Sequence, residues 1–278
     1  MKMSQENKPK KRIKLFEDEC FMGVNIRKAY EAAKNEPEKP KSDKLDNYLK
    51  NYILLPQNNE HPDLIIAKNR LSYNTEVEQA AKKLSLNLKN NSQDYIGNIN
   101  FDQSHNLLEE LGSFMLNPKL FTEFLKLLKS GNAIDGNKNK INSNELETIL
   151  KGITELRDPF RREWLDHKYS QSKNKLLVTY HKFDSSGKLI KVTEALDSDT
   201  LMEDKTPGMD LEDWINNRTS QGLPKSNVSD GSLYFLKPTE ESVTRFDAYA
   251  DWAVLFCNRD PLTWSASLGV REVKIFRR

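Results

Sequence analysis

The chain has 278 residues, 37% of them hydrophobic and 30% charged, and its 43 Lys and Arg against 41 Asp and Glu give a formal charge of +2. This near balance argues against a dedicated nucleic-acid-binding protein, which usually has a clear basic excess. Two cysteines, Cys20 and Cys257, rule out a disulfide framework, and no apolar run approaches the ~20 residues of a transmembrane helix.

The first 44 residues are predicted to form a flexible, basic tail and linker. Residues 1–14 are polar and basic, and we interpret "PKKRIK" as part of a solvated tail. Residues 21–36 predict a short amphipathic helix, and "PEKPKSDK" at 37–44 is typical of a Pro- and Lys-rich linker. The amino terminus lacks an apolar stretch of signal-peptide length, so we expect a cytoplasmic or virion-associated protein.

Residues 45–160 predict a helical module. The clearest helix begins at Pro118, which suits a first turn, and ends before Gly131, which is a good stop. Four segments in all show the three- and four-residue apolar spacing of amphipathic helices: 75–90, 104–116, 117–131 and 143–157.

Residues 161–278 predict a domain richer in strands. Two strand-like runs flank the turn sequence "DSSG" at 184–187 and predict a hairpin. A short helix follows, with Asp210 as its expected cap. The remaining strands are expected at 231–238, 242–249, 252–257 and 267–276. The predicted fold class is therefore α+β, with an N-terminal helical module followed by a mixed domain containing antiparallel strands.

The segment "DGNKNKINSNEL" at 135–146 resembles a calcium loop between two helices but departs from the required pattern. Lys140 stands at the sixth position, where a working loop needs glycine, and Glu145 falls at the eleventh position instead of the twelfth. We interpret the segment as a polar connector.

The four histidines offer no recognisable metal or catalytic spacing. They are His61, His105, His167 and His181, all distant in sequence. Asp166 beside His167 invites an acid–base interpretation, but no Ser or Cys stands in a nucleophile turn, and no glycine-rich phosphate motif is present. We interpret these histidines as surface or locally bonded side chains. The expectation is a protein that is not an enzyme and has no metal and no cofactor.

The most informative stretch is "ADWAVLFCNRDPLTWSASLGVR" at 250–271. Small or aliphatic residues alternate at Ala253, Leu255 and Cys257, which predicts a strand with one core face. The positions expected to face outward or to lie in loops are Asp247, Tyr249, Asp251, Trp252, Val254, Phe256, Asn258, Arg259, Asp260, Leu262, Thr263, Trp264 and Ser265.

These outward positions predict a ligand-binding surface, because Trp, Tyr and Arg dominate binding hot spots. In this interpretation Trp252, Phe256 and Trp264 are apolar anchors, and Tyr249 and Arg259 are amphipathic contacts. The alternative is that the aromatic residues pack under a loop or against the helical module.

The arrangement "SVTRFDAYADWAVLFC…P…SASLGVR" resembles the variable region of target proteins of diversity-generating retroelements. The region ends in a short signature that Gly269, Val270 and Arg271 match. The resemblance implies a C-type-lectin-like (formylglycine-generating-enzyme-like) ligand-binding domain over 161–278. Its strand framework would display residues that the retroelement rewrites by adenine-directed mutagenesis.

The resemblance also limits the chemistry to expect. Calcium-dependent sugar binding in relatives uses Glu-Pro-Asn or Trp-Asn-Asp motifs, which are absent here, and Cys257 alone is expected to be a core residue. The implied origin is archaeal or bacterial, in a virus or mobile element.

The expected function is recognition of an unknown protein or surface ligand through protein–protein interaction, with an oligomer left open. The alternative is a structural or assembly protein of a virus or mobile element whose aromatic face is buried at an interface. Exposure of Trp252, Val254, Phe256 and Trp264 distinguishes the two.

Overall fold

The computed structural model describes residues 20–21, 24–25, 41–90 and 95–276. The chain divides into two compact units, 1–39 and 40–278. In the first unit, β1 (Cys20–Phe21) pairs antiparallel with β2 (Val24–Asn25). The helix predicted over 21–36 is wrong at these strand residues, and its other residues, like the predicted tail, lie outside the described part.

The second unit begins with a helix where the sequence predicted a linker. Helix α2 (Lys41–Leu49) covers the last four residues of the expected linker at 37–44. That part of the prediction is wrong.

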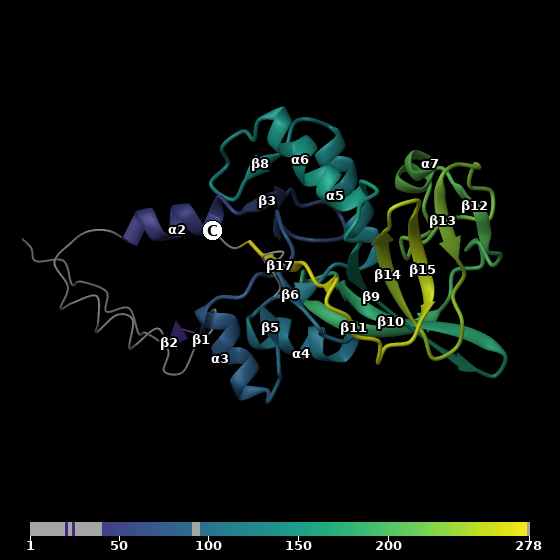
Figure 1. The fold of residues 1–278 in the computed structure, drawn as a ribbon, viewed down its shortest axis with the longest axis horizontal. Coiled ribbons are helices and arrows are strands. Elements are labelled where there is room, and N and C mark those ends of the chain that lie inside the picture. Colours follow the sequence, from purple (N-terminus) through teal and green to yellow (C-terminus); the bar gives the residue numbers. More distant parts are fainter. Residues whose placement is uncertain (1–19, 22–23, 26–40, 91–94, 277–278) are drawn as a thin grey trace, which may run out of the picture. The chain divides into compact units, whose positions relative to one another are not determined.

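An eight-stranded mixed sheet is the largest sheet of the second unit (Figure 1). Its order is β11-β10-β9-β14-β15-β13-β12, and β16 also pairs with β9. The β13–β15 and β16–β9 pairs are parallel, and the others are antiparallel. The strands are β9 (Arg161–Ser172), β10 (Lys175–Phe183), β11 (Leu189–Ala195), β12 (Lys205–Met209), β13 (Leu233–Leu236), β14 (Val243–Ala248), β15 (Ala253–Arg259) and β16 (Leu268–Gly269).

A five-stranded antiparallel sheet joins the two ends of the unit. Strand β17 near the C-terminus lies between β7 and β4 in the order β7-β17-β4-β3-β8. Residues 45–160 are therefore not purely helical as predicted, and they share a sheet with the C-terminal segment. The strands are β3 (Tyr52–Leu55), β4 (Leu64–Ala67), β7 (Phe114–Met115), β8 (Ile134–Asp135) and β17 (Glu272–Ile275). A separate pair joins β5 (Lys89–Asn90) to β6 (Ile96–Gly97).

The four helices predicted within 45–160 and the short helix after Asp210 are present, with shifted ends. Helix α5 starts at Pro118 after an Asn117 cap whose side chain accepts from the Leu120 amide at 2.8 Å, and Gly131 follows with φ +70°. Asp210 caps α7 as predicted. The helices are α3 (Thr75–Lys83), α4 (Phe101–Glu110), α5 (Pro118–Lys129), α6 (Ser143–Thr154) and α7 (Leu211–Asn216). The α+β class is confirmed.

The eight-stranded sheet has two covered faces, which we name after the helices that pack on them. On the α5 face, Phe246 packs against Phe121 of α5 with ring centroids 5.2 Å apart. On the α4 face, Trp164 meets Phe101 of α4 edge-on at 5.8 Å. Trp164 lies next to Leu165, which belongs to the α5 face, so strand alternation sends neighbouring side chains to opposite sides.

Candidate functional site

Strands β14 and β15, expected at 242–249 and 252–257, pair as a hairpin with a tight turn. The Tyr249 amide donates to the Trp252 carbonyl at 2.9 Å, and the two strands pair from Ala248 and Ala253 onward. Leu255 and Cys257 are fully buried on the α5 face, as expected for the core side of this strand.

Three residues predicted to face outward are buried. Asp247, Val254 and Phe256 are 0%, 1% and 5% exposed. Their side chains do lie on the α4 face, opposite Leu255, but that face is not open there. The guanidinium groups of Arg245 and Arg259 lie over the Phe256 ring at 5.5 and 3.4 Å. The prediction of exposure at these three positions is wrong, because a strand in the middle of a sheet can be covered on both sides.

Other predicted positions are accessible. Trp252, Leu262 and Trp264 are 39%, 66% and 70% exposed. Asp251 and Asp260 are also exposed. Five positions are partly buried: Tyr249, Asn258, Arg259, Thr263 and Ser265.

The exposed aromatic residues belong to two separate places. The Trp252 indole stacks on Tyr234 with centroids 5.9 Å apart and an interplanar angle of 9°, and Tyr249 lies 5.7 Å away. Leu262 and Trp264 line a different hollow of about 650 Å³, together with Ser85, Leu86, Asn87, Leu88, Asn98, Asn100 and Gln103. The structure thus divides the surface that the sequence predicted as one.

A charged network lies beside Trp252 on the α4 face. Arg245 binds the Asp247 carboxylate with two hydrogen bonds of 2.7 Å, and the Tyr249 hydroxyl donates to the same carboxylate at 2.8 Å. Burial raises the pKa of Asp247, and the opposing effect of Arg245 does not cancel it. Arg162 Nε lies 3.5 Å from Asp247 Oδ2, and Arg259 lies close by over Phe256. Two guanidinium groups therefore face the Asp247 carboxylate, and that of Arg259 lies over the Phe256 ring.

This network leaves hydrogen-bonding capacity unused. Seven buried side-chain polar atoms of the described residues lack a hydrogen bond, and four of them lie here. They are Arg162 Nε, Arg245 Nη1, Asn258 Oδ1 and Arg259 Nε. A buried polar atom without a partner costs about 1–3 kcal/mol, so such a concentration calls for a reason. These four atoms themselves have almost no accessible surface, so a partner could touch this network only at the partly exposed parts of Arg162, Asn258 and Arg259.

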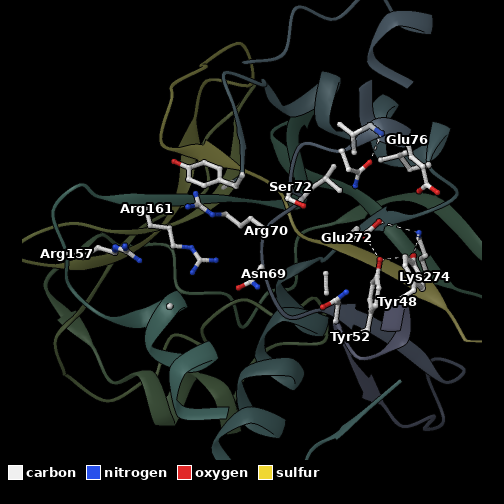
Figure 2. A pocket seen from close by; sticks show the side chains of 18 residues that line it. Tyr48, Tyr52, Asn69, Arg70, Ser72, Glu76, Arg157, Arg161, Glu272 and Lys274 are labelled. Atoms are coloured by element: carbon white, nitrogen blue, oxygen red, sulfur yellow. Dashed lines mark hydrogen bonds and ion pairs between the residues drawn. The ribbon is translucent and has the colours of Figure 1, made fainter. Parts of the chain in front are cut away.

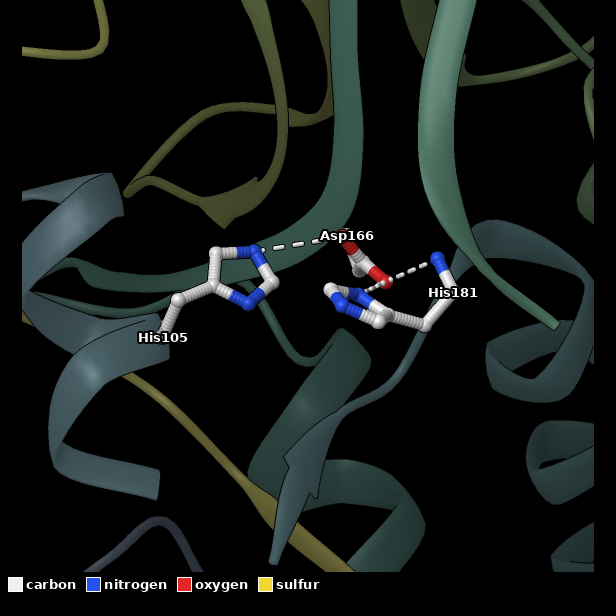
Figure 3. A group of neighbouring side chains, drawn as sticks. All are labelled: His105, Asp166 and His181. Atoms are coloured by element: carbon white, nitrogen blue, oxygen red, sulfur yellow. Dashed lines mark hydrogen bonds and ion pairs between the residues drawn. The ribbon is translucent and has the colours of Figure 1, made fainter. Parts of the chain in front are cut away.

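A second cluster, missed by the sequence analysis, joins His105 of α4, Asp166 of β9 and His181 of β10 (Figure 3). Strand β9 bulges between Leu165 and Lys168, which pair with the consecutive residues Thr244 and Val243 of β14. The Asp166 amide leaves the ladder and donates to the Leu116 carbonyl at 2.8 Å. Bulges re-aim side chains in this way.

The two imidazoles contact different oxygens of Asp166. His105 Nε2 lies 3.1 Å from Oδ1, and His181 Nδ1 lies 2.9 Å from Oδ2, which also accepts the His181 amide at 2.7 Å. Burial acts to raise the pKa of Asp166, but the hydrogen bonds from His105 and His181 hold it well below its usual range. The carboxylate is ionised and the cluster borders a hollow of about 520 Å³.

His167, next to Asp166, has the opposite environment. It is fully buried on the α5 face, and burial lowers its pKa to about 3. Its Nδ1 lies 3.3 Å from the Tyr169 hydroxyl. Asp166 and His167 are adjacent in the sequence, but their side chains lie on opposite faces of the sheet, so they do not form the acid–base pair that the sequence suggested.

A cavity of about 650 Å³ borders the five-stranded sheet (Figure 2). Arg70, Arg157 and Arg161 line one part of it, and Tyr52, Glu272 and Lys274 line another. Most of its polar groups have partners within the molecule: Tyr52 donates to Glu272, Arg161 donates to Glu163 at 2.8 Å, and Arg70 donates to the Ser267 carbonyl at 2.8 Å.

Among the described residues, no helix combines the length and apolar character that a membrane span requires. No family model matches the chain, and neither the curated proteins nor the solved structures contain a match.

Proposed function

We propose that this chain is a non-enzymatic recognition protein that binds a partner through the α4 face beside Trp252. We define this arginine–aromatic surface as Arg162, Tyr234, Tyr249, Trp252, Asn258 and Arg259. The observation that carries the proposal is the exposed indole of Trp252, stacked on Tyr234 beside the partly exposed guanidinium groups of Arg162 and Arg259.

The chemistry of the surface favours an acidic partner. Arg162 and Arg245 face a single carboxylate, Asp247, while Arg259 lies over the Phe256 ring, and guanidinium groups are donors only. The partner must therefore bring acceptor oxygens, and carboxylates suit the planar guanidinium geometry best. Trp252 and Tyr234 add apolar area at the edge. An acidic segment of a partner protein that also carries an apolar side chain fits this surface.

We further propose that residues 161–278 form a C-type-lectin-like domain of the kind used by diversity-generating retroelements. The antiparallel β14–β15 hairpin and the Gly269–Val270–Arg271 signature support this. Gly269 has a packing role: a Cβ there would lie 3.1 Å from Arg70 Cδ and 3.2 Å from the Tyr95 ring. In this proposal, diversification would act on the hairpin and the loop after it.

A peptide library displayed on phage tests the recognition surface. The immobilised full chain should select peptides rich in Asp and Glu, and Arg259→Gln and Trp252→Ala should each abolish most of the capture. Met202→Ala removes an exposed hydrophobic side chain elsewhere and serves as the matched control. Selection of basic peptides, or equal capture by all the variants, contradicts the proposal.

Genomic context tests the retroelement origin separately. We expect a reverse-transcriptase gene beside the gene for this chain, with a near-copy of the codons for 243–271 that differs only at adenines. A gene with neither neighbour contradicts diversification and leaves the recognition surface to be judged on the selection experiment.

A further inference from the structure

We infer that His105, Asp166 and His181 form a binding site for one divalent transition-metal ion, with Zn²⁺ the best-suited ion. This site is separate from the arginine–aromatic surface: His105 and His181 contact Asp166, and none of the three contacts Trp252 or Arg259. The inference does not depend on the proposed function.

The donor set suits Zn²⁺. Two imidazole nitrogens and one carboxylate are ligands found in zinc sites that keep an open coordination position. One ligand atom from each of the three residues lies within 4.8 Å of the other two. The two nitrogen–oxygen distances, 3.1 and 2.9 Å, approach the roughly 3.3 Å that separates ligands bound at ~2.0 Å around a tetrahedral ion.

The surrounding structure holds the ligands in place without metal. Asp166 is fixed by two hydrogen bonds: its amide donates to the Leu116 carbonyl, and its carboxylate accepts from the His181 amide. The His105 ring packs on Phe101 at 4.7 Å, and the two imidazoles lie 5.4 Å apart on either side of the carboxylate (Figure 3). Such pre-positioning lowers the ordering cost of metal binding.

The site is open on one side. It borders the 520 Å³ hollow, whose lining also includes Asp102, Glu109, Lys168 and Lys191. Lys168 is within 3.5 Å of Asp102, so acidic and basic groups offset each other around the hollow. The space leaves room for water to complete the coordination of an ion held by three protein ligands.

A second histidine–carboxylate pair in the molecule, His61 and Glu123, differs because an arginine occupies the other carboxylate oxygen. His61 Nε2 lies 3.0 Å from Glu123 Oε2, but the other oxygen, Oε1, accepts from Arg218 at 2.8 Å. A guanidinium at that position opposes a cation. Asp166 instead offers both oxygens to imidazoles, which makes His61 a natural control for the metal experiment.

Zinc and cobalt titrations of the full chain test the inference. After removal of bound metal with a chelator, isothermal titration with Zn²⁺ should give one ion per chain. Co²⁺ should give the visible absorption bands of a four- or five-coordinate ion with nitrogen ligands. His105→Ala, His181→Ala and Asp166→Asn should each weaken Zn²⁺ binding at least ~100-fold, because direct ligands matter at least as much as their supporting groups. His61→Ala should bind as the unchanged protein does.

Folding is controlled by circular dichroism of each variant without metal. His105 is partly exposed on a helix, so His105→Ala should keep the fold even where Asp166→Asn does not. Absence of stoichiometric Zn²⁺ binding by the unchanged chain overturns the inference. Binding retained in both His105→Ala and His181→Ala, or lost in His61→Ala, overturns it as well.

Discussion

The two faces of the eight-stranded sheet carry different kinds of residues, although the same strands supply both. The α5 face holds Leu165, Phe246 and Leu255 in one large apolar cluster. The α4 face holds Arg245, Asp247 and other charged groups beside a smaller apolar patch. The α5 face belongs to the larger apolar cluster, and the α4 face is where the candidate sites gather.

Two adjacent residues of β9, Asp166 and His167, show the same difference between the two faces. Asp166 points to the α4 face and is ionised, while His167 points to the α5 face and is neutral. Both are buried, so exposure does not distinguish them. The difference is that two imidazoles surround the carboxylate, whereas His167 has no charged partner in hydrogen-bond contact.

The largest loss of stability should come from removing a large apolar side chain from the α5 face. Phe246→Ala removes a ring that packs on Phe121, and we expect a loss of about 3–5 kcal/mol in the free energy of unfolding. Urea denaturation of the full chain measures it. A loss below ~1 kcal/mol would mean that the α5 face is not the stabilising side.

Breaking the buried ion pair of the α4 face should cost somewhat less. Arg245→Met leaves Asp247 with only the Tyr249 hydroxyl and the more distant Arg162, and we expect a loss of about 2–4 kcal/mol. The double variant Arg245→Met with Asp247→Leu should recover most of that loss, because it removes the unpaired charge. A stability loss of the double variant equal to the sum of the losses of Arg245→Met and Asp247→Leu alone would contradict this account.

The pH dependence of the stability that Asp247 contributes gives a further test of the α4 face. Its folded pKa is raised by burial, so the folded chain holds the proton to higher pH than the unfolded chain does. The stability contributed by this group is therefore fully present below the unfolded pKa of ~3.9 and is lost as pH rises through the folded value. Compared with Asp247→Asn, the unchanged protein should lose relative stability over the interval above pH ~4, measured by urea denaturation. A relative gain over that interval would show that Arg245 outweighs burial.

Local signals in the sequence predicted part of this fold well. Asn117–Pro118 and Gly131 delimit α5, and Asp210 caps α7, because capping and helix termination depend on nearby residues. The four-residue strands β3 and β4, "YILL" and "LIIA", were missed because continuous apolar runs have no period that separates strand from helix.

The long strand β9 and the histidine cluster were missed for a related reason. Both faces of β9 are covered and a bulge interrupts its alternation, so "RREWLDHKYSQS" shows no regular pattern. One signal was present: Asn174 is a residue type that tolerates the positive φ of a two-residue hairpin turn. In the structure Lys173 and Asn174 join β9 to β10 with φ of 47° and 63°. A hairpin centred there brings Asp166 opposite His181. The approach of His105 depends on tertiary packing and had no local signal.

The smallest stability change should come from Trp252→Ala, on the edge of the α4 face. The indole is partly exposed and its main contact is the stack on Tyr234, which is worth about 0.5–1.5 kcal/mol. We expect a loss of about 1 kcal/mol or less in the free energy of unfolding, measured beside Phe246→Ala under identical conditions. The same variant should lose most of the peptide capture. A side chain that matters little to folding and much to binding is what a recognition surface predicts, whereas a large stability loss with capture intact would place Trp252 in the structural core.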